Sequence, residues 1–396
     1  MKQFYKSTER LVLCLGLIFS SFNAIAQPTV LRTEAASAGT WTNYAVSDMG
    51  TFRQARFQAS TAGAAGRGWL FGEGSTTSAT FTTNWRPWSG SGTQVRIPGY
   101  NQIITPSTSS PPTYGSATYN TGSGGVDGQM QAIVANRYYN FNLSKNSSSG
   151  SPQNETMAVL ETDYNPVAIS TVTRSATTIY PNNAALIQVT TASAPANGEF
   201  LYLRYTTNNW TSSTIVPVAM QGTRGEAVIP CFTNLTKVDY YVYSSNRTKA
   251  QIDAAVTSNG QLAHDLFSLN LNNNAGSNYT YTVTSGTAFI GAYLVPSTCY
   301  STINSFVTAL NSGTVSGPVT LLVSAGHTET APVGGIQLTK SGTSTDKIVI
   351  RRTGVGINPT IRANAGVWST AQNTTGTCDA IFRINGADYI TIDGIK

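Results

Sequence analysis

Residues 379–396 limit the fold most, because they hold two short apolar segments with a tight polar corner between them. The segments are residues 380–384 and 389–392, and residues 385–388 (NGAD) form the corner. Short strands joined by Gly or Asn corners, with no helix between them, are typical of the coils of a parallel β-helix. A solenoid needs stacked repeats and a closing cap to bury its core. We therefore expect the sequence to be the front part of a longer protein.

Residues 1–26 have the three parts of a secretory signal peptide. Lys2, Lys6 and Arg10 form a basic start, residues 11–19 are apolar, and a small-residue cleavage site ends at Ala26. The apolar run is too short for a membrane anchor, which needs about 20 residues. We expect a protein that is secreted to the extracellular space or the outer cell surface, with no transmembrane segment after signal removal.

Charged residues are scarce in this chain. The 24 Lys and Arg and 18 Asp and Glu residues give a formal net charge of +6, and charged residues make up 11% of the sequence. Soluble domains usually have about 25%. The basic residues are scattered, whereas a nucleic-acid interface needs a concentrated basic face. We therefore expect no nucleic-acid partner, and we interpret the Thr-, Ser-, Asn- and Gly-rich composition as that of extracellular all-β modules.

Strand and turn spacing divides the mature sequence into three modules, residues 27–165, 166–286 and 287–396. Turn-rich spacers between short strands favour a β-sandwich for the first module. Strands of the second module recur at intervals of roughly 12–15 residues, near the spacing of an immunoglobulin-like or fibronectin type III sandwich. The strands predicted there are residues 185–190, 200–206, 214–220, 225–229, 238–244 and 279–283.

The third module begins with the best helical pattern of the chain, residues 301–310, with Ser301 as the expected N-cap and Gly313 just past its end. Four apolar residues share one face of this helix: Ile303, Phe306, Val307 and Leu310. Short strands follow. The predicted fold class is therefore all-β: two β-sandwich modules, then the N-terminal cap and first coils of a right-handed parallel β-helix.

Three tryptophans close together in the first module are candidates for glycan binding: Trp69, Trp85 and Trp88. Exposed aromatic rings on a sandwich could stack on sugar rings. The alternative is that these side chains fill the core of the sandwich or cover its edge, as large aromatic residues usually do.

Three cysteines follow the signal peptide, Cys231, Cys299 and Cys378, which is an odd number for an oxidising compartment. We favour a Cys299–Cys378 disulfide, because both residues fall in the third module. Free thiols, or a disulfide to a partner beyond the C-terminus of the sequence, are the alternative. We expect no metal and no cofactor, since Cys-x-x-Cys is missing and the histidines, His264 and His327, have no ligand-spaced companions.

No catalytic residue is predicted. Enzymes that cleave glycosidic bonds commonly use two carboxyl groups, and the dense acids of the third module are Asp379, Asp388 and Asp393. Asp388 and Asp393 lie at corners, where Asp commonly hydrogen-bonds its own backbone, so we interpret them as structural. His327, two residues before Glu329, is interpreted as a surface residue rather than a general base.

Two sets of motifs carry a resemblance. Residues 203–214 (LRYTTNNWTSST), 225–230 (GEAVIP) and 238–243 (VDYYVY) resemble a sandwich module common in large exported surface proteins of the Bacteroidota. Residues 317–321 (GPVTL), 356–361 (GINPTI) and 387–394 (ADYITIDG) resemble the start of the pectin-lyase-like β-helix region of the same proteins. Many of those proteins carry a sorting signal for type IX secretion, which this sequence does not show. The resemblance implies architecture, because that fold hosts lyases, hydrolases and adhesive stalks alike.

These observations predict a secreted or cell-surface modular protein without enzymatic activity, which serves adhesion, matrix building or glycan contact. The expected partner is an extracellular polysaccharide or a host or matrix surface. The alternative is the accessory region of a polysaccharide lyase or glycoside hydrolase whose catalytic coils lie beyond residue 396.

Overall fold

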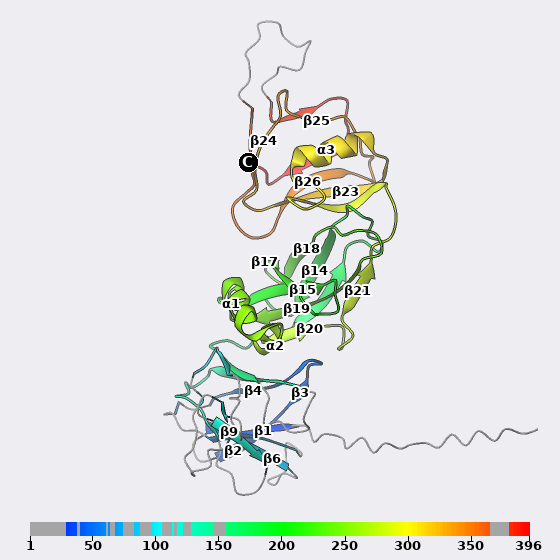
Figure 1. The fold of residues 1–396 in the computed structure, drawn as a ribbon. Helices are drawn as coiled ribbons and strands as arrows, with labels where there is room; N and C mark the ends of the chain where they lie inside the picture. The colour runs from blue at the N-terminus through cyan, green and yellow to red at the C-terminus, as the bar shows by residue number, and fades with distance from the viewer. Residues whose placement is uncertain are drawn as a thin grey trace, which may run out of the picture.

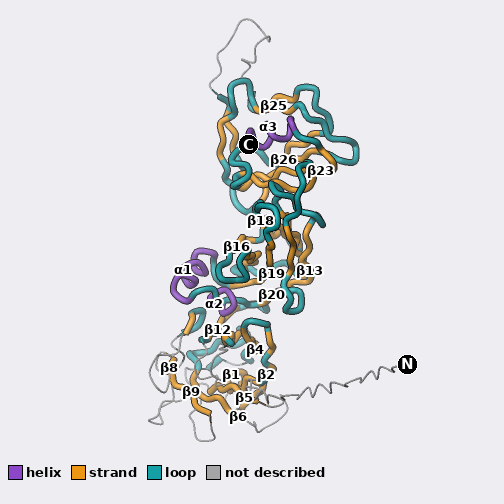
Figure 2. The backbone as a smooth tube through the Cα atoms, turned by 45° about the vertical axis from the view of Figure 1, so that its right-hand side comes forward, coloured by secondary structure: helices purple, strands orange, loops and turns teal. Residues whose placement is uncertain are grey.

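Three β-rich units follow one another along the chain and lie in a row in the computed structural model (Figure 1, Figure 2). We name them the N-terminal unit (residues 29–162), the sandwich unit (residues 167–283) and the C-terminal unit (residues 289–396). Strands dominate the described residues, as the predicted all-β class requires. The structure describes residues 29–37, 40–60, 62–63, 68–73, 83–87, 97, 99–104, 113–114, 117–121, 128–145, 156–364 and 380–396.

The N-terminal unit contains two antiparallel sheets that share one core. The strand order of the first sheet is β2 (Thr40–Ala45), β1 (Val30–Ser37), β5 (Gly68–Glu73), β6 (Thr83–Pro87), β9 (Ala117–Thr121) and β8 (Thr113–Tyr114), and β10 (Gly128–Gln129) also pairs with β5. The order of the second is β3 (Ser47–Asp48), β4 (Phe52–Gln58), β11 (Tyr138–Ser144), β12 (Met157–Thr162) and β7 (Ile103–Ile104). Aromatic side chains from both sheets fill the core: Phe57, Trp69, Phe71, Tyr139 and Phe141.

The sandwich unit is built from two antiparallel sheets around a second core. The strand order of the first sheet is β13 (Ile169–Arg174), β14 (Ala185–Thr191), β18 (Arg224–Ile229) and β17 (Ala219–Gln221). The order of the second is β16 (Thr214–Pro217), β15 (Phe200–Thr206), β19 (Lys237–Ser245) and β20 (Asn270–Asn272), and β21 (Tyr279–Thr282) also pairs with β19. The predicted strand 214–220 is two strands, because the chain leaves one sheet at the buried Val218 and joins the other.

Both faces of β19 are buried. Val238, Tyr240 and Val242 point into the sandwich core, whereas Tyr241 and Tyr243 belong to a second cluster on the outer face of the sheet. Two helices that the strand pattern does not predict, α1 (Lys249–Asn259) and α2 (Leu262–Leu266), contribute to that cluster (Figure 1).

The C-terminal unit contains strands that pair only in parallel within its described part. The main sheet has the order β22 (Phe289–Val295), β23 (Val315–Ser324), β26 (Ile348–Thr353) and β29 (Ile390–Asp393). Two smaller sheets pair β24 (Thr328–Thr330) with β27 (Thr360–Arg362) and β25 (Ile336–Leu338) with β28 (Phe382–Ile384). The chain therefore passes through the three sheets in the same order twice, first through β23, β24 and β25 and then through β26, β27 and β28.

Helix α3 (Ile303–Ser312) packs into the core of this unit (Figure 2). The four apolar residues predicted to share its inner face, Ile303, Phe306, Val307 and Leu310, are all buried. Thr302 is the N-cap, one residue after the predicted Ser301, because its side chain accepts the backbone N–H of Ser305.

Candidate functional site

Trp69 cannot stack on a sugar ring, because its side chain lies inside the N-terminal unit. It is 2% exposed and packs edge-on against Phe71, with ring centroids 6.0 Å apart. Phe141 of the opposite sheet lies 5.4 Å from it between centroids. The glycan-binding prediction is therefore wrong for Trp69, and the core interpretation applies. The side chain of Trp85 and all of Trp88 lie outside the described residues.

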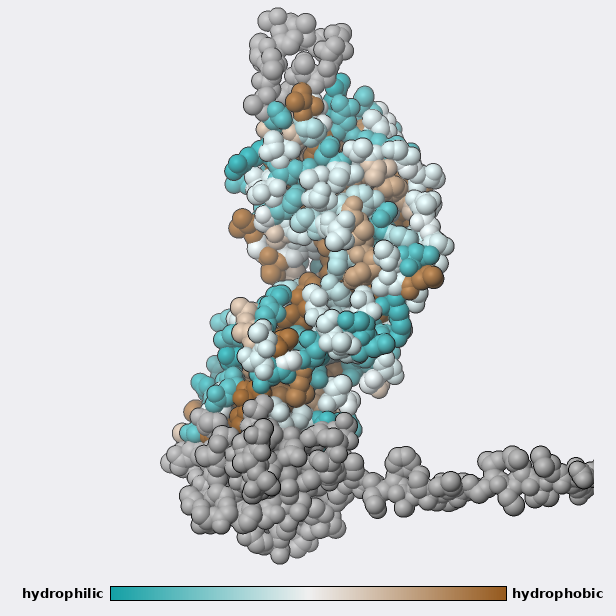
Figure 3. Space-filling model, viewed as in Figure 1, coloured by the Kyte–Doolittle hydropathy of each residue, from teal (hydrophilic) through white to brown (hydrophobic). Residues whose placement is uncertain are grey.

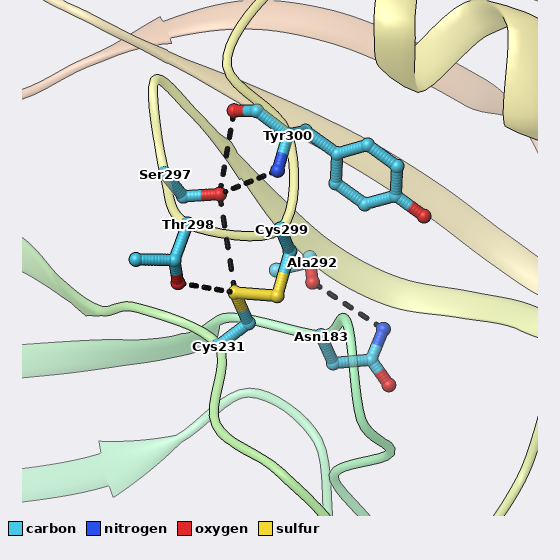
Figure 4. Close-up of a disulfide and its surroundings, with 7 residues drawn as sticks. All are labelled: Asn183, Cys231, Ala292, Ser297, Thr298, Cys299 and Tyr300. Carbon is cyan, nitrogen blue, oxygen red and sulfur yellow. Dashed lines mark hydrogen bonds between the residues drawn. A yellow bond between two sulfur atoms is a disulfide. The ribbon is translucent and has the colours of Figure 1, made fainter.

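The disulfide joins Cys231 of the sandwich unit to Cys299 of the C-terminal unit (Figure 4). The predicted Cys299–Cys378 pairing is wrong, since Cys299 is already bonded, and Cys378 lies outside the described residues. The two cysteines are 68 residues apart in sequence. Closing a loop of this size stabilises the folded state by roughly 4 kcal/mol in the chain-entropy model.

Non-covalent contacts fix the same joint. The Asn183 Nδ2 group donates to the carbonyl oxygen of Ala292 at 3.4 Å (Figure 4). It also donates to the carbonyl oxygen of Ile290, at 2.9 Å. The backbone N–H of Ala184 also donates to Ala292, at 2.8 Å. An apolar cluster closes the contact between the sheets: Ala184, Leu186, Val228, Ala292 and Leu322. The sandwich and C-terminal units therefore meet through a packed interface.

A bidentate ion pair lies beside this apolar cluster. The two Nη atoms of Arg351 on β26 each lie 2.8 Å from a carboxylate oxygen of Glu226 on β18. The Thr353 hydroxyl donates to the same carboxylate at 3.1 Å. Burial alone would raise the pKa of Glu226, but the hydrogen bonds and the charge of Arg351, with the Thr353 hydroxyl, outweigh burial and lower it. Glu226 is therefore ionised at neutral pH and fully paired.

Beyond the ion pair the two sheets separate and leave a cleft of about 930 Å³. Strand β18 places two outward residues along it, Glu226 in the ion pair and Arg224 at the exposed end, and Val228 on the same face belongs to the apolar cluster. Arg352 of β26 lines the cleft too, and its Nη1 donates to Gly356 O and Asn358 Oδ1 at 3.0 and 2.9 Å. The cleft is thus a polar site built by two units, which sequence spacing does not reveal because its walls lie more than 100 residues apart.

The joint between the N-terminal and sandwich units is held by side-chain amides. The Asn142 Nδ2 group donates to the carbonyl oxygens of Leu266 and Ser268 at 2.9 and 2.7 Å, and Gln54 Nε2 donates to Ser268 O at 3.1 Å. Asn246 of the sandwich unit donates to the Glu161 carbonyl at 3.0 Å. Residues of β12 belong to the apolar cluster beneath α1 and α2. This joint is therefore packed like the second one.

Polar side chains hold α2 against the sheet. Arg204 of β15, whose side chain is 4% exposed, donates to Tyr241 Oη and Asp265 Oδ1 at 2.5 and 3.1 Å. The Tyr241 hydroxyl also donates to Asp265 Oδ1, at 3.1 Å. Each buried charge is therefore offset by the other, and the removal of one partner would leave the other buried and unpaired.

His264 of α2 lies next to this cluster and is 2% exposed. Its Nδ1 is 3.1 Å from the Tyr243 hydroxyl, and its Nε2 has no hydrogen-bond partner among the described residues. Burial, with the positive charges of Arg204 and Lys249, lowers the pKa of His264 to about 3. The imidazole is therefore neutral at neutral pH.

The side chains of His327 and Glu329 are buried rather than exposed, so the surface interpretation of His327 is wrong. Their side chains are 8% and 4% exposed, and His327 Nε2 lies 3.2 Å from Glu329 Oε2. The Glu329 carboxylate accepts the backbone N–H groups of Ile303 and Asn304 at 2.7 and 3.0 Å. It therefore satisfies two of the free donors at the start of α3, where the helix dipole also favours a negative charge.

Asp388 and Asp393 lie at the corners around β29, and Asp379 lies outside the described residues. Within the part of the chain that the structure describes, no three His, Cys, Asp or Glu side chains gather in a way that would hold a metal ion. In that same part, no helix combines the length and the apolar character needed to span a membrane.

No family model matches the sequence, and no curated protein matches it. Among solved structures, the chain is similar to a segment of two fibronectin type III domains from chicken tenascin, with 9% sequence identity. The match covers 51% of this chain and 89% of the tenascin segment at a TM-score of 0.18, a value too low to carry an argument.

Proposed function

We propose that the chain is a secreted or cell-surface modular protein without enzymatic activity, which serves adhesion, matrix building or glycan contact. One observation carries this proposal: three β units are joined in a row by two packed joints, and a disulfide crosses the second. Units within a chain move relative to one another by default, unless the interface between them is large and apolar or otherwise fixed. Fixed joints suit a protein that holds a contact surface at a set distance.

Support for export comes from the disulfide and from the leader. Disulfides persist in oxidising compartments and are rare in the cytosol. Residues 1–26 have the pattern of a secretory signal peptide. We propose the outer cell surface or the extracellular space as the destination.

We infer that the C-terminal unit begins a right-handed parallel β-helix, with α3 as its cap. The support is the repeated parallel pairing, in which β23 to β25 and β26 to β28 run through the same three sheets in the same order. The sandwich unit is proposed to be immunoglobulin- or fibronectin III-like, on the strength of its two antiparallel sheets and shared core. Membership in the large exported Bacteroidota surface proteins that these motifs resemble is part of the same proposal.

Two experiments test the proposal. Expression of the whole chain in a bacterium that exports it should give a product whose N-terminal sequence begins at Gln27, and a product that keeps residues 1–26 would contradict export. The purified product should then be retained by immobilised polysaccharides or matrix proteins without releasing new reducing ends or unsaturated sugars. Release of such products by the chain would contradict a non-enzymatic role and favour a lyase or hydrolase.

A further inference from the structure

The cleft between the sandwich and C-terminal units carries a positive charge that its own walls do not neutralise. Glu226 is fully paired with Arg351 and Thr353. Arg224 lines the opposite end of the same sheet face, and its side chain makes no hydrogen bond or ion pair with any described residue. An exposed arginine on a cleft wall offers a fork of N–H donors that matches a carboxylate.

A second guanidinium faces the cleft from the other unit. Arg352 is held at one Nη atom by Gly356 O and Asn358 Oδ1, so its orientation is set before a ligand binds. The residues that line the cleft include three arginines and two acids, Glu226 and Asp393, so the lining carries one net positive charge. An anionic ligand is therefore favoured, but the excess is too small for a polyphosphate such as nucleic acid.

The rest of the lining is rich in groups that both donate and accept hydrogen bonds. Hydroxyl and amide side chains come from both units: Thr173, Gln188, Thr190, Gln221 and Asn358. The apolar part is small and contains no aromatic ring among the lining residues. Such a surface suits the hydroxyl groups of a sugar better than the apolar side chains of a peptide, because each hydroxyl is both donor and acceptor.

We propose that this cleft binds a polysaccharide that carries carboxylate groups, with Arg224 and Arg352 as the residues that recognise the acid. The cleft volume of about 930 Å³ lies at the upper end of the range for small-molecule sites, so it holds a short stretch of the polymer and leaves the rest outside. The proposal rests on the proposed function, of which glycan contact is one form. It adds the position of the site and the charge of the ligand.

The test measures retention of the purified whole chain in native gels that contain polygalacturonate, alginate or neutral dextran. The two acidic polymers should slow the migration of the unsubstituted protein. The effect should weaken as the salt concentration rises, because the contact is partly ionic. Arg224→Gln should weaken binding about tenfold, the usual effect of losing one charge-assisted hydrogen bond. Arg362→Gln removes an exposed arginine of β27 that does not line the cleft and should bind like the unsubstituted protein.

The outcomes separate the two proposals. Equal retardation of the unsubstituted protein and of both Arg224→Gln and Arg352→Gln would overturn the cleft site while leaving glycan contact in place. Retardation by dextran as strong as by the acidic polymers would overturn the role of charge. If none of the three polymers retards the protein, the cleft proposal fails, whereas adhesion to a matrix protein remains testable by the assay for the proposed function. Melting temperatures of all variants should match, which excludes unfolding as the cause.

Discussion

Protonation of His264 should cost the protein stability in mildly acidic solution. His264 is buried between α2 and β19, and its pKa lies at about 3 in the folded state. In the unfolded chain a histidine has a pKa of about 6.5. At pH values between these two pKa values, His264 is therefore protonated in the unfolded state and neutral in the folded state. The His264 contribution is fully present above about pH 6.5 and is lost as the pH falls toward 3.

The size of the effect at pH 5 follows from the unfolded pKa, because the folded imidazole takes up its proton only at much lower pH. At pH 5 the solution is about 1.5 pH units below the pKa of the unfolded histidine, so protonation stabilises the unfolded state by about 2 kcal/mol. Burial also raises the pKa values of the Asp265 and Glu199 carboxyl groups, so these groups add to the pH dependence of stability. The carboxyl groups are the same in the unsubstituted protein and in a variant without the histidine. Their contribution therefore cancels when the free energies of unfolding of the two proteins are compared.

His264→Gln removes the titrating group, and Tyr243→Phe is the matched control, because it removes the hydrogen bond to Nδ1 and keeps the imidazole. Urea unfolding at pH 7.5 and pH 5, followed by the near-ultraviolet circular dichroism of the tyrosines, measures the free energy of unfolding. The unsubstituted protein and Tyr243→Phe should each lose about 2 kcal/mol more than His264→Gln between the two pH values. An equal loss in all three proteins would refute the buried, neutral state of His264.

Three further predictions concern the joints and the core. Replacement of Cys231 and Cys299 by serine should lower the free energy of unfolding by roughly 4 kcal/mol and abolish the shift of the melting temperature with reductant; a reductant-dependent shift that survives would contradict the pairing. Glu226→Gln should weaken the second joint by about 1–3 kcal/mol, since Arg351 loses its charged partner, and limited proteolysis should then cut between the two units faster; unchanged cleavage would show that the ion pair does not hold the joint. Trp69→Ala should cost about 3–5 kcal/mol by calorimetry and leave polysaccharide retention of the folded protein unchanged; lost retention with unchanged stability would place the indole on the surface after all.

Strands of the sandwich unit could be predicted because their patterns are local. Alternating apolar residues and Gly or Asn turns locate β15 and β18 within a residue or two of their observed bounds. The helix pattern likewise located α3, since four apolar residues on one face must be buried together. Helix α1 gave no such pattern, because only Ile252 of its residues is buried. The capping box between Thr248 and Gln251 is the signal that could have located it.

The candidate site could not be predicted, because it depends on contacts between distant segments. Glu226 and Arg351 are 125 residues apart, and no sequence pattern links the two positions. The predicted cysteine pairing is wrong for the same reason. It assumed that both cysteines belong to one module, whereas the disulfide joins two units. The sequence predicts a surface position for His327, because a lone histidine near an acid usually lies there. In the structure the neighbouring Glu329 carboxylate instead accepts the free N–H groups at the start of α3.

The position of the disulfide decides how the chain would respond to pulling. A force applied to the two ends enters the bridge at Cys231 and leaves it at Cys299, so the segment between them carries no tension while the bond is intact. That segment holds β19, both helices of the sandwich unit and β22. Without the bridge, the sequence separation of 68 between the two cysteines would add roughly 240 Å of extended length. Under load, β19 would thus keep its pairing with β20 and β21, which lie inside the bridged segment, and the extension would come from the chain on either side of the bridge.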